Sequence, residues 1–521
     1  MMKKVRVKVF RYNPDVDLKP RYEAYEVPWF PNMKVLDALL YIQENIDPTL
    51  AFRYECRVWR CGSCSILING RPGAACKTEI EEGKDLVLEP LPHLSVIRDV
   101  AVDLSGLRQE LATTITPFCV VTSKPSELFK IPPEKMEDFV PTTQCIECWS
   151  CVSACPVVTK SPADFRGPAF IVALAQSIFN PINEIDHLPT SVSHGLYNCT
   201  TCRSCWESCP EELNIPEIAI EKLRALAVEH GIGPLAGHLE FGRLIRETGK
   251  SIARTTTSFL ESLEKEVIGV KSPKNRVGFF VGCLADYRLQ GVARAVVDVL
   301  KRQKVEVVIP KNQVCCGSPL IRTGQMAEVK RLIGTNINVF RDSEVDEVVT
   351  ACAGCSLTLK NNYGSLAEKY LGIKELPFKV YQLSEYLFHN LKMTNEGMNK
   401  IEMRVTWHDP CHLRRGQGLY REPRKILRLI PGIELVEMEN PDLCCGAGGG
   451  VRAGNRGLSR KLGEARVDAI KEVNVDAVVT ECPFCVIQIL DAVGEAGLNT
   501  KVVYLEELLS SAYAPEHLSN K

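Results

Sequence analysis

Hydrophobic and polar residues alternate near the start of the chain in the manner of β-strands. Residues 4–12 (KVRVKVFRY) and 22–30 (YEAYEVPWF) place apolar side chains at about every second position, which is the period of a strand with one buried face. Residues 34–46 (KVLDALLYIQENI) repeat their apolar side chains at helical spacing instead. These segments predict two strands followed by a helix.

The same domain continues with a predicted hairpin. Residues 64–76 (CSILINGRPGAAC) read as a strand, a tight turn at Asn69-Gly70 and a returning strand. Residues 85–91 (DLVLEPL) predict a further strand that closes the domain. We therefore expect a small β-rich domain over residues 1–105.

The apolar spacing becomes helical in the next part of the chain. Residues 168–179 (PAFIVALAQSIF) and 215–231 (IPEIAIEKLRALAVEHG) have the period of amphipathic or buried helices. Residues 250–275 (KSIARTTTSFLESLEKEVIGVKSPKN) predict a helix that runs into a polar linker containing proline. This pattern indicates a helical domain over residues 106–270.

The remainder of the chain is a duplication. RVGFFVGC ending at Cys283 corresponds to RVTWHDPC ending at Cys411, VCCGSP corresponds to LCCGAG, and DEVVTACAGC corresponds to DAVVTECPFC. The offset of about 130 residues is that of a duplicated domain, because solenoid repeats are much shorter. β-branched runs alternate with helical segments in each copy, which predicts two α/β domains with parallel strands, at residues 271–397 and 398–521. In such domains sites form beyond the carboxyl ends of the strands.

Composition narrows the class of protein. The 521 residues carry a net charge of −1 and a charged fraction of 24%, so nothing indicates a nucleic-acid partner. No apolar run reaches the ~18 residues of a transmembrane helix, and the start of the chain does not resemble a signal peptide. We expect a cytoplasmic protein with no transmembrane segment of its own, soluble or held at a membrane only through a partner.

The chain contains 23 cysteines, and 22 of them fall into tight groups. In a reducing compartment, cysteines at fixed spacings indicate metal ligands rather than disulfides. Cys119 stands alone, and we interpret it as a small buried apolar residue.

The first group has the spacing of a plant-type [2Fe–2S] site. Four and then two residues separate the first three cysteines, and a fourth follows downstream; the group consists of Cys56, Cys61, Cys64 and Cys76. A zinc site is the alternative, although zinc ribbons favour two Cys-x-x-Cys pairs and this segment has one.

Two later groups, CIECWSCVSACP and CTTCRSCWESCP, match the ferredoxin run with two, two and three intervening residues followed by proline. In paired runs the fourth cysteine binds the other cluster. We therefore assign one [4Fe–4S] cluster to Cys145, Cys148, Cys151 and Cys209. The other is assigned to Cys199, Cys202, Cys205 and Cys155.

A resemblance to a known family covers residues 1 to about 230. These motifs, with LEPLPHLSVIRDVAVDL, resemble the iron–sulfur subunit of the succinate dehydrogenase/fumarate reductase family. The resemblance implies an α+β domain of β-grasp type, an all-α domain with two [4Fe–4S] clusters, and electron transfer to a flavoprotein subunit that carries FAD. The chain departs from that family in having four cysteines in its last run, where the respiratory subunits usually hold a [3Fe–4S] cluster beside a quinone. It also continues for about 250 further residues.

The duplicated part carries two adjacent cysteines in each copy, which rarely form a disulfide with each other. The first copy contains Cys283, Cys315, Cys316, Cys352 and Cys355. The second contains Cys411, Cys444, Cys445, Cys482 and Cys485. Both sets resemble the cysteine-rich CCG domain of heterodisulfide reductases, and the resemblance implies a non-cubane [4Fe–4S] cluster in each copy. Zinc or an ordinary cubane cluster is the alternative. Gly317 and Gly446 would let the backbone approach such a cluster closely.

Such a site suits a small thiol or disulfide substrate, because coordination favours the thiolate. His412 lies beside Cys411 and could supply a proton, whereas His408 fits strand-end packing better. Arg414 and Arg415 could hold a phosphate or carboxylate of the substrate, with a solvated loop as the alternative. The glycine run after Cys445 lacks the context of a dinucleotide-binding loop.

The two halves together resemble the iron–sulfur subunits of thiol:fumarate reductases. That family implies oxidation of coenzyme M and coenzyme B to their heterodisulfide at the duplicated domain, with electrons passing to a flavoprotein that reduces fumarate. One alternative is an electron-transfer subunit of a succinate dehydrogenase or 2-hydroxyacid oxidase, in which the duplicated domain only docks a redox or quinone-linked partner. A zinc-stabilised scaffold is the other.

Overall fold

The structure, a computed structural model, describes residues 3–115 and 131–513. Cys119 lies outside the described residues. Internal packing divides the chain into two compact units. Unit 1 comprises Met1–Cys199 and Arg203–Leu223, and unit 2 comprises Thr200–Cys202 and Arg224–Lys521.

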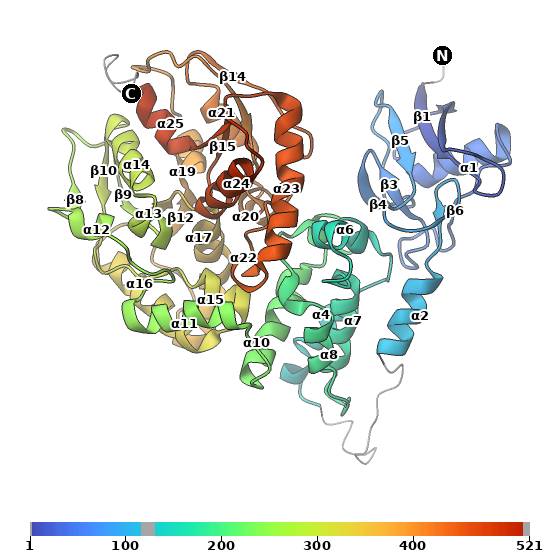
Figure 1. Cartoon of the computed structure of the whole chain (residues 1–521), viewed down its shortest axis with the longest axis horizontal. Coiled ribbons are helices and arrows are strands. Elements are labelled where there is room, and N and C mark those ends of the chain that lie inside the picture. The colour runs from blue at the N-terminus through green and yellow to red at the C-terminus, as the bar shows by residue number, and fades with distance from the viewer. Residues whose placement is uncertain (1–2, 116–130, 514–521) are drawn as a thin grey trace. The chain divides into compact units, whose positions relative to one another are not determined.

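Unit 1 begins with a five-stranded sheet of order β2-β1-β5-β3-β4 (Figure 1). Its strands are β1 (Lys4–Arg11), β2 (Arg21–Pro28), β3 (Ser65–Ile68), β4 (Arg71–Ala74) and β5 (Leu86–Glu89). β1 pairs antiparallel with β2 and parallel with β5, and β3 pairs antiparallel with β4 and β5. The predicted strands and the turn at Asn69-Gly70, where both residues have positive φ, are confirmed.

The strand predicted over residues 85–91 is confirmed as β5, but it is not the last strand of the domain. β5 lies between β1 and β3, and a small hairpin, β6 (Val96–Arg98) and β7 (Ala101–Val102), follows it. The predicted helix is α1 (Val35–Asn45), whose apolar face packs on the inward side chains of the sheet. Strand alternation thus places one face of β1 in this core, as the sequence indicated.

The rest of unit 1 is built from short helices around the ferredoxin-type runs. They are α2 (Ser105–Thr114), η1 (Pro133–Met136), α4 (Phe139–Thr142), α5 (Ser150–Ser153), α6 (Pro156–Lys160), α7 (Pro168–Phe179), α8 (Leu188–Ser193), η2 (Leu196–Asn198), α9 (Ser204–Glu207) and η3 (Pro216–Ile220). α10 (Glu221–Glu229) begins here and continues into unit 2. α7 is buried along most of its length, which explains its nearly continuous apolar sequence.

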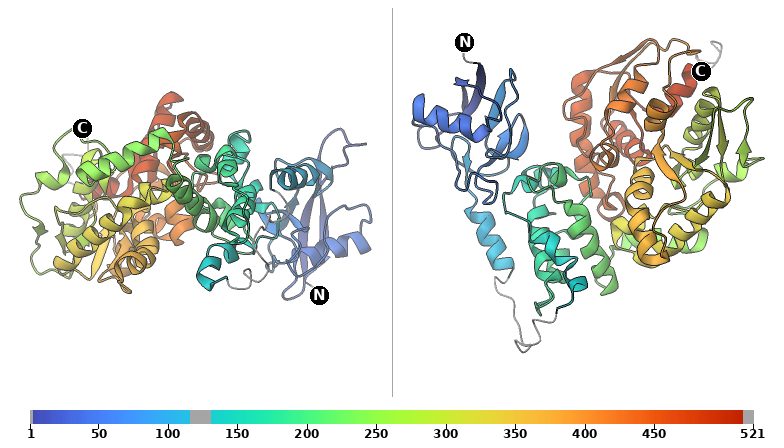
Figure 2. Two further views of the ribbon diagram at one scale, coloured as in Figure 1. Left: turned by 90° about the horizontal axis from the view of Figure 1, so that it is seen from below. Right: turned by 180° about the vertical axis from the view of Figure 1, so that it is seen from behind.

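Unit 2 contains two sheets with matching topology, coloured green to yellow and orange to red in Figure 2. The first has the order β12-β11-β9-β10-β8 and the second β14-β13-β15-β16. If β9 to β12 are matched with β13 to β16, the four common strands have the same order, and all of their pairings are parallel. The strands are β8 (Val267–Ile268), β9 (Asn275–Phe279), β10 (Val305–Val308), β11 (Glu347–Thr350), β12 (Lys379–Gln382), β13 (Met403–Trp407), β14 (Ile433–Leu435), β15 (Ala477–Thr480) and β16 (Lys501–Tyr504). The predicted duplication of an α/β domain is confirmed.

Helices connect these strands in both copies. Unit 2 contains α11 (Ala236–Thr248), α12 (Phe259–Ser262), α13 (Cys283–Tyr287), α14 (Gln290–Arg302), α15 (Ser318–Thr323), η4 (Met326–Glu328), α16 (Val329–Asp342), α17 (Ala353–Leu357), η5 (Thr358–Asn362), α18 (Tyr363–Leu371), α19 (Leu383–Glu385), η6 (Tyr386–Asn390), α20 (Cys411–Gln417), α21 (Arg421–Leu427), α22 (Val451–Gly454), α23 (Arg456–Val473), α24 (Pro483–Glu495) and α25 (Leu505–Ala512).

The two copies share one hydrophobic core. α14 of the first copy packs on α25 of the second, where Ser510 donates a hydrogen bond to Asp298 and Gln303 donates one to the hydroxyl of Tyr513. The hydroxyl of Tyr504 reaches back to the carbonyl oxygen of Ala351, at 3.0 Å. The copies therefore pack into a single compact body and are not two separate domains joined by a linker.

The helix predicted over residues 250–275 is mostly wrong. Only α12 is helical there, started by a capping box between Ser258 and Glu261, and β8 pairs antiparallel with β10 at the edge of the first sheet. The three β-branched residues 255–257 disfavour a helix, and Ser251 donates its backbone N–H to the sulfur of Cys283. Among the helices of the described residues, none is long and apolar enough to span a membrane.

Candidate iron–sulfur sites

The loop between α1 and β3, together with the end of β4, gathers the first cysteine group. Cys64 immediately precedes β3 and Cys76 follows β4, so the hairpin brings their sulfurs to 3.3 Å. Cys56 contacts the thiol of Cys61 and receives the backbone N–H groups of Val58 and Arg60, which lower the pKa of Cys56 to about 7. Backbone N–H groups aimed at sulfur are what an anionic cluster in this loop needs.

The two ferredoxin-type runs repeat the same unusual backbone. Glu147 and Trp149 in the first run have φ values of 50° and 63°, and Thr201 and Arg203 in the second have 52° and 65°. Left-handed conformations cost about 1 kcal/mol or more for residues other than glycine. Their recurrence at matching positions indicates that both runs are shaped to wrap a bound group.

The cysteines of the first run meet the last cysteine of the second. Cys145 interacts electrostatically with Cys148 and Cys209, and Cys151 with all three. Burial raises the pKa of Cys151 well above its ordinary value and that of Cys145 to about 12. This grouping is the one that paired ferredoxin runs require. In the other group Cys155, Cys199, Cys202 and Cys205 are all buried.

The five cysteines of the first CCG copy lie beyond the carboxyl ends of β9, β10 and β11. Contacts between thiols connect Cys283 to Cys315, Cys316 to Cys355, and Cys355 to Cys352. The adjacent residues Cys315 and Cys316 join the two ends into one chain of sulfurs. Contact with Cys316 and Cys352, together with burial, raises the pKa of the Cys355 thiol well above its ordinary value.

The second copy repeats this chain of contacts. Cys411 contacts Cys444, the sulfurs of Cys445 and Cys485 lie 3.5 Å apart, and Cys485 contacts Cys482. Gly446 follows the vicinal pair with φ of 92°, and a Cβ there would lie 2.6 Å from the carbonyl oxygen of Ser459, so only glycine fits.

A segment of the second ferredoxin run packs against the second copy within unit 2. The thiol of Cys444 contacts that of Cys202 and lies 3.5 Å from the hydroxyl of Thr200. A Cβ on Gly448 would lie 2.5 Å from the carbonyl oxygen of Thr200. Cys202, assigned to a ferredoxin-type cluster, therefore touches the second CCG site directly.

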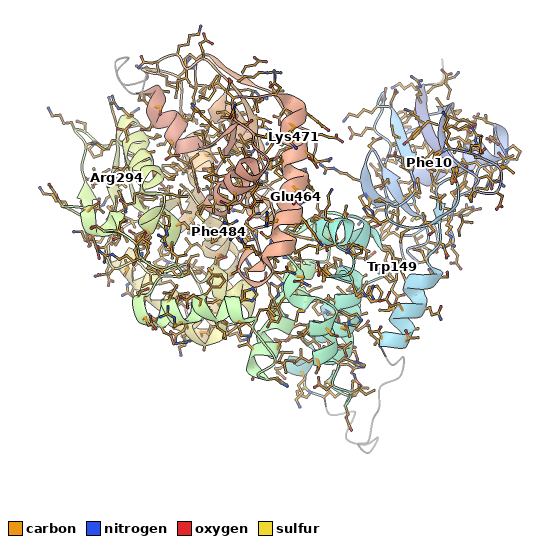
Figure 3. All side chains as sticks on the ribbon, viewed as in Figure 1. Phe10, Trp149, Arg294, Glu464, Lys471 and Phe484 are labelled. Carbon is orange, nitrogen blue, oxygen red and sulfur yellow. The ribbon has the colours of Figure 1, made fainter. Side chains whose placement is uncertain are left out.

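One cavity of about 380 Å³ is lined by all ten CCG cysteines. The carboxyl ends of both sheets face this cavity, and its wall is mostly apolar. Phe484 belongs to this wall and is labelled in Figure 3 on α24. The two cysteine sets thus form one site with two halves.

Of the polar residues that the sequence indicated as possible substrate contacts, one lines the cavity and two do not. His412 lines the cavity and reaches toward the first copy, since a Cβ on Gly354 would lie 3.7 Å from its Nδ1. Arg414 and Arg415 instead form ion pairs with Asp442 and are not among the lining residues.

Three other arginines line the cavity, and none of them is predicted from the sequence: Arg322, Arg452 and Arg456. Arg322 follows the first vicinal pair by six residues, and Arg452 follows the second by seven. An arginine six or seven residues after each vicinal pair was the available signal.

The cysteines of the two ferredoxin-type runs fit iron–sulfur clusters better than single ions. A tetrahedral zinc ion would bring thiolates to about 3.8 Å from one another. Among the residues that the structure describes, no three cysteines of the ferredoxin-type runs come within 4.8 Å of one another in this way. Burial raises the pKa of Cys151, and buried thiols of this kind resist ionisation unless cations neutralise them.

Comparison with known proteins agrees with this geometry. Residues 6–109 match a 2Fe-2S iron-sulfur cluster binding domain, and residues 141–213 match a 4Fe-4S dicluster domain. Residues 277–360 and 405–490 each match the cysteine-rich domain named CCG. A protein of Methanothermobacter marburgensis, named as a subunit of fumarate reductase (CoM/CoB), is 42% identical over 98% of this chain and 100% of that protein. The chain belongs to the family of that subunit.

Two further relatives each match only a part of this chain. A subunit of the dihydromethanophenazine:CoB--CoM heterodisulfide reductase of Methanosarcina acetivorans is 32% identical over 67% of this chain and 88% of its own length. A fumarate reductase iron-sulfur subunit of Mycobacterium tuberculosis is 34% identical over 45% of this chain and 97% of its own length. The chain is an oxidoreductase subunit with iron–sulfur domains.

Proposed function

We propose that this chain oxidises two small thiols to a disulfide in the cavity between the CCG copies and delivers the electrons to a flavoprotein that reduces fumarate to succinate. The observation that carries the proposal is the single cavity with all ten cysteines in its wall. A docking platform for another protein would need an exposed surface, whereas this site is a chamber of small-molecule size.

The substrates suggested by the relative's name are coenzyme M and coenzyme B. Joining two thiols into a disulfide releases two electrons and two protons, and reducing fumarate to succinate consumes two of each. In this chain the apolar wall would exclude water, and the two cysteine sets would hold one sulfur of the disulfide on each side. His412 is proposed to contact the substrate from the cavity wall.

The cofactors proposed for this chain are one [2Fe–2S], two cubane [4Fe–4S] and two non-cubane [4Fe–4S] clusters, which supply one-electron transfer when bound. FAD is proposed on the partner flavoprotein. The site residues are those assigned from the sequence. The contact between Cys202 and Cys444 supports electron exchange between the ferredoxin-type domain and the second CCG copy.

We propose four domains at residues 1–105, 106–270, 271–397 and 398–521. The first is proposed to be of β-grasp type and the second all-α. Their mixed sheet with one helix and their array of short helices support these assignments.

The first test is iron and acid-labile sulfide per chain after anaerobic purification, with EPR spectra before and after addition of the two thiols. The five proposed clusters require about 18 irons, and a thiol-dependent signal is expected. About 10 irons with zinc making up the difference would reduce the duplicated domain to a structural or docking part.

A further inference from the structure

The two halves of the cavity differ at one buried position. β9 and β13 end in corresponding sequences, RVGFFVGC and RVTWHDPC, and Phe280 in the first corresponds to His408 in the second. Both side chains are fully buried, at 0% and 1% exposure. One copy thus has a benzene ring where the other has an imidazole.

The imidazole of His408 is aimed at cysteine sulfurs. One of its nitrogens and the sulfurs of Cys445 and Cys485 all lie within 4.8 Å of one another. Among the described residues, neither ring nitrogen has a hydrogen-bond partner at ordinary hydrogen-bond geometry. A buried N–H group without a partner is costly, so donation to the sulfur of Cys445 is the interaction that the geometry offers.

A second difference between the copies also places positive charge beside the second site. Arg466 on α23 is fully buried and donates to the carbonyl oxygens of Asn440 and Leu443, just before the second vicinal pair. Asn336 on α16 has the corresponding role in the first copy, where it donates to the carbonyl oxygen of Cys315. At this position the second site therefore has a buried cation where the first has a neutral amide. The buried Lys250, which acts on Cys283 of the first site, is paired with Asp286 at 3.0 Å.

The negative charge next to His408 does not offset the positive charge of Arg466 beside the second site. Asp409, its neighbour in sequence, accepts two hydrogen bonds from Arg424 and one from the indole of Trp407. That carboxylate is therefore already neutralised by its own arginine. Solvent exposure also does not distinguish the two sites, because Cys316 and Cys445 are equally buried, at 4% each.

We propose that His408 donates a hydrogen bond to Cys445 and raises the reduction potential of the second CCG site above that of the first. Hydrogen bonds to sulfur and nearby positive charge both favour the reduced, more negative cluster. The inference rests on the proposed function only in requiring a cluster in each copy. It makes the second site, which touches Cys202, the half of the cavity that is reduced first.

The test is an EPR-monitored redox titration of the full chain purified anaerobically, with iron counted on the same samples. The signal of the second site is the one that Cys445→Ser removes. His408→Phe installs the residue of the first copy and is expected to shift the midpoint of that signal to lower potential, while the signal of the first site stays in place. His408→Gln retains an N–H donor and is expected to recover most of the shift.

Phe280→His provides the matched variant, because it is expected to raise the midpoint of the first site. An unchanged midpoint in His408→Phe at full iron content would overturn the proposal. Loss of about four irons in the same variant would also overturn it, since His408 would then hold the metal rather than tune it. If the unmodified chain shows no signal that depends on Cys445, the proposed cluster of the second copy fails first, and this inference fails with it.

Discussion

One polar side chain of unit 1 that has many hydrogen-bond partners is not a cluster ligand. Arg11 on β1 is almost fully buried and donates to Asp99 at 3.1 Å, Glu23 at 3.0 Å and Thr49 at 2.8 Å. Asp99 in turn accepts the backbone N–H of Ala51 at 2.8 Å. The pair thus anchors the segment that leads into the cysteine loop starting at Cys56.

Replacing this arginine should destabilise the N-terminal domain. Arg11→Met leaves the carboxylate of Asp99 buried without its cation, and removing one partner of such a pair costs about 3–5 kcal/mol. The free energy of unfolding can be followed in urea by the loss of the visible absorbance expected for a [2Fe–2S] cluster.

Arg21→Met is the matched control. Arg21 is half exposed and pairs with Asp17 and Glu23 at the surface, so its loss should cost no more than about 1 kcal/mol. Equal effects of the two substitutions would refute the anchoring role of Arg11.

At the scale of elements, close backbone contacts hold the wall of the CCG cavity. α11 crosses α22, and a Cβ on Gly237 would lie 2.2 Å from the carbonyl oxygen of Ala453, a cavity-lining residue. His238, the next residue, lies 2.9 Å from the carbonyl oxygen of Gly450. The helix before the duplication therefore positions the glycine-rich segment after the second vicinal pair.

Gly237→Ala should push these two helices apart. Overpacking of a close contact costs about 1–3 kcal/mol, and the expected result is a lower urea midpoint for unit 2 by far-UV circular dichroism. Gly364→Ala is the control, because a Cβ at that position in α18 meets nothing within 4 Å. It should be neutral or stabilising by up to ~1 kcal/mol. A neutral Gly237→Ala variant would contradict the close packing.

The sequence predicted the elements correctly where a local pattern, such as strand alternation or a turn motif, is enough to fix the structure. Alternation placed β1 and β2, the Asn69-Gly70 turn placed the hairpin, and repetition of CC-Gly placed the cysteines at strand ends. The sequence failed where tertiary contacts decide. The cavity wall combines Arg322 with Arg452 across about 130 residues, and Asp442 engages Arg414. Residues 250–257 form an irregular segment rather than a helix. None of these follows from a neighbour in sequence.

At the scale of the whole molecule, the shared core and cavity make the CCG copies one functional body. Copies with separate sites would lose function independently. Halves of one cavity would both have to be intact to hold the two sulfurs of the proposed disulfide. The chain of sulfur contacts passes through the vicinal pair in each copy, so the second cysteine of each pair is a sensitive position.

Cys316→Ser and Cys445→Ser should therefore have the same consequence although they lie in different copies. Each is expected to remove about four of about 18 irons and to lower thiol-dependent fumarate reduction at least ~100-fold, while the EPR signals of the [2Fe–2S] and cubane clusters remain. Cys119→Ser, at the one ungrouped cysteine, should retain the full iron content and the activity. If either variant kept the thiol-dependent signal at full strength, one copy alone would be sufficient for the chemistry, and the two-sided cavity would lose its role.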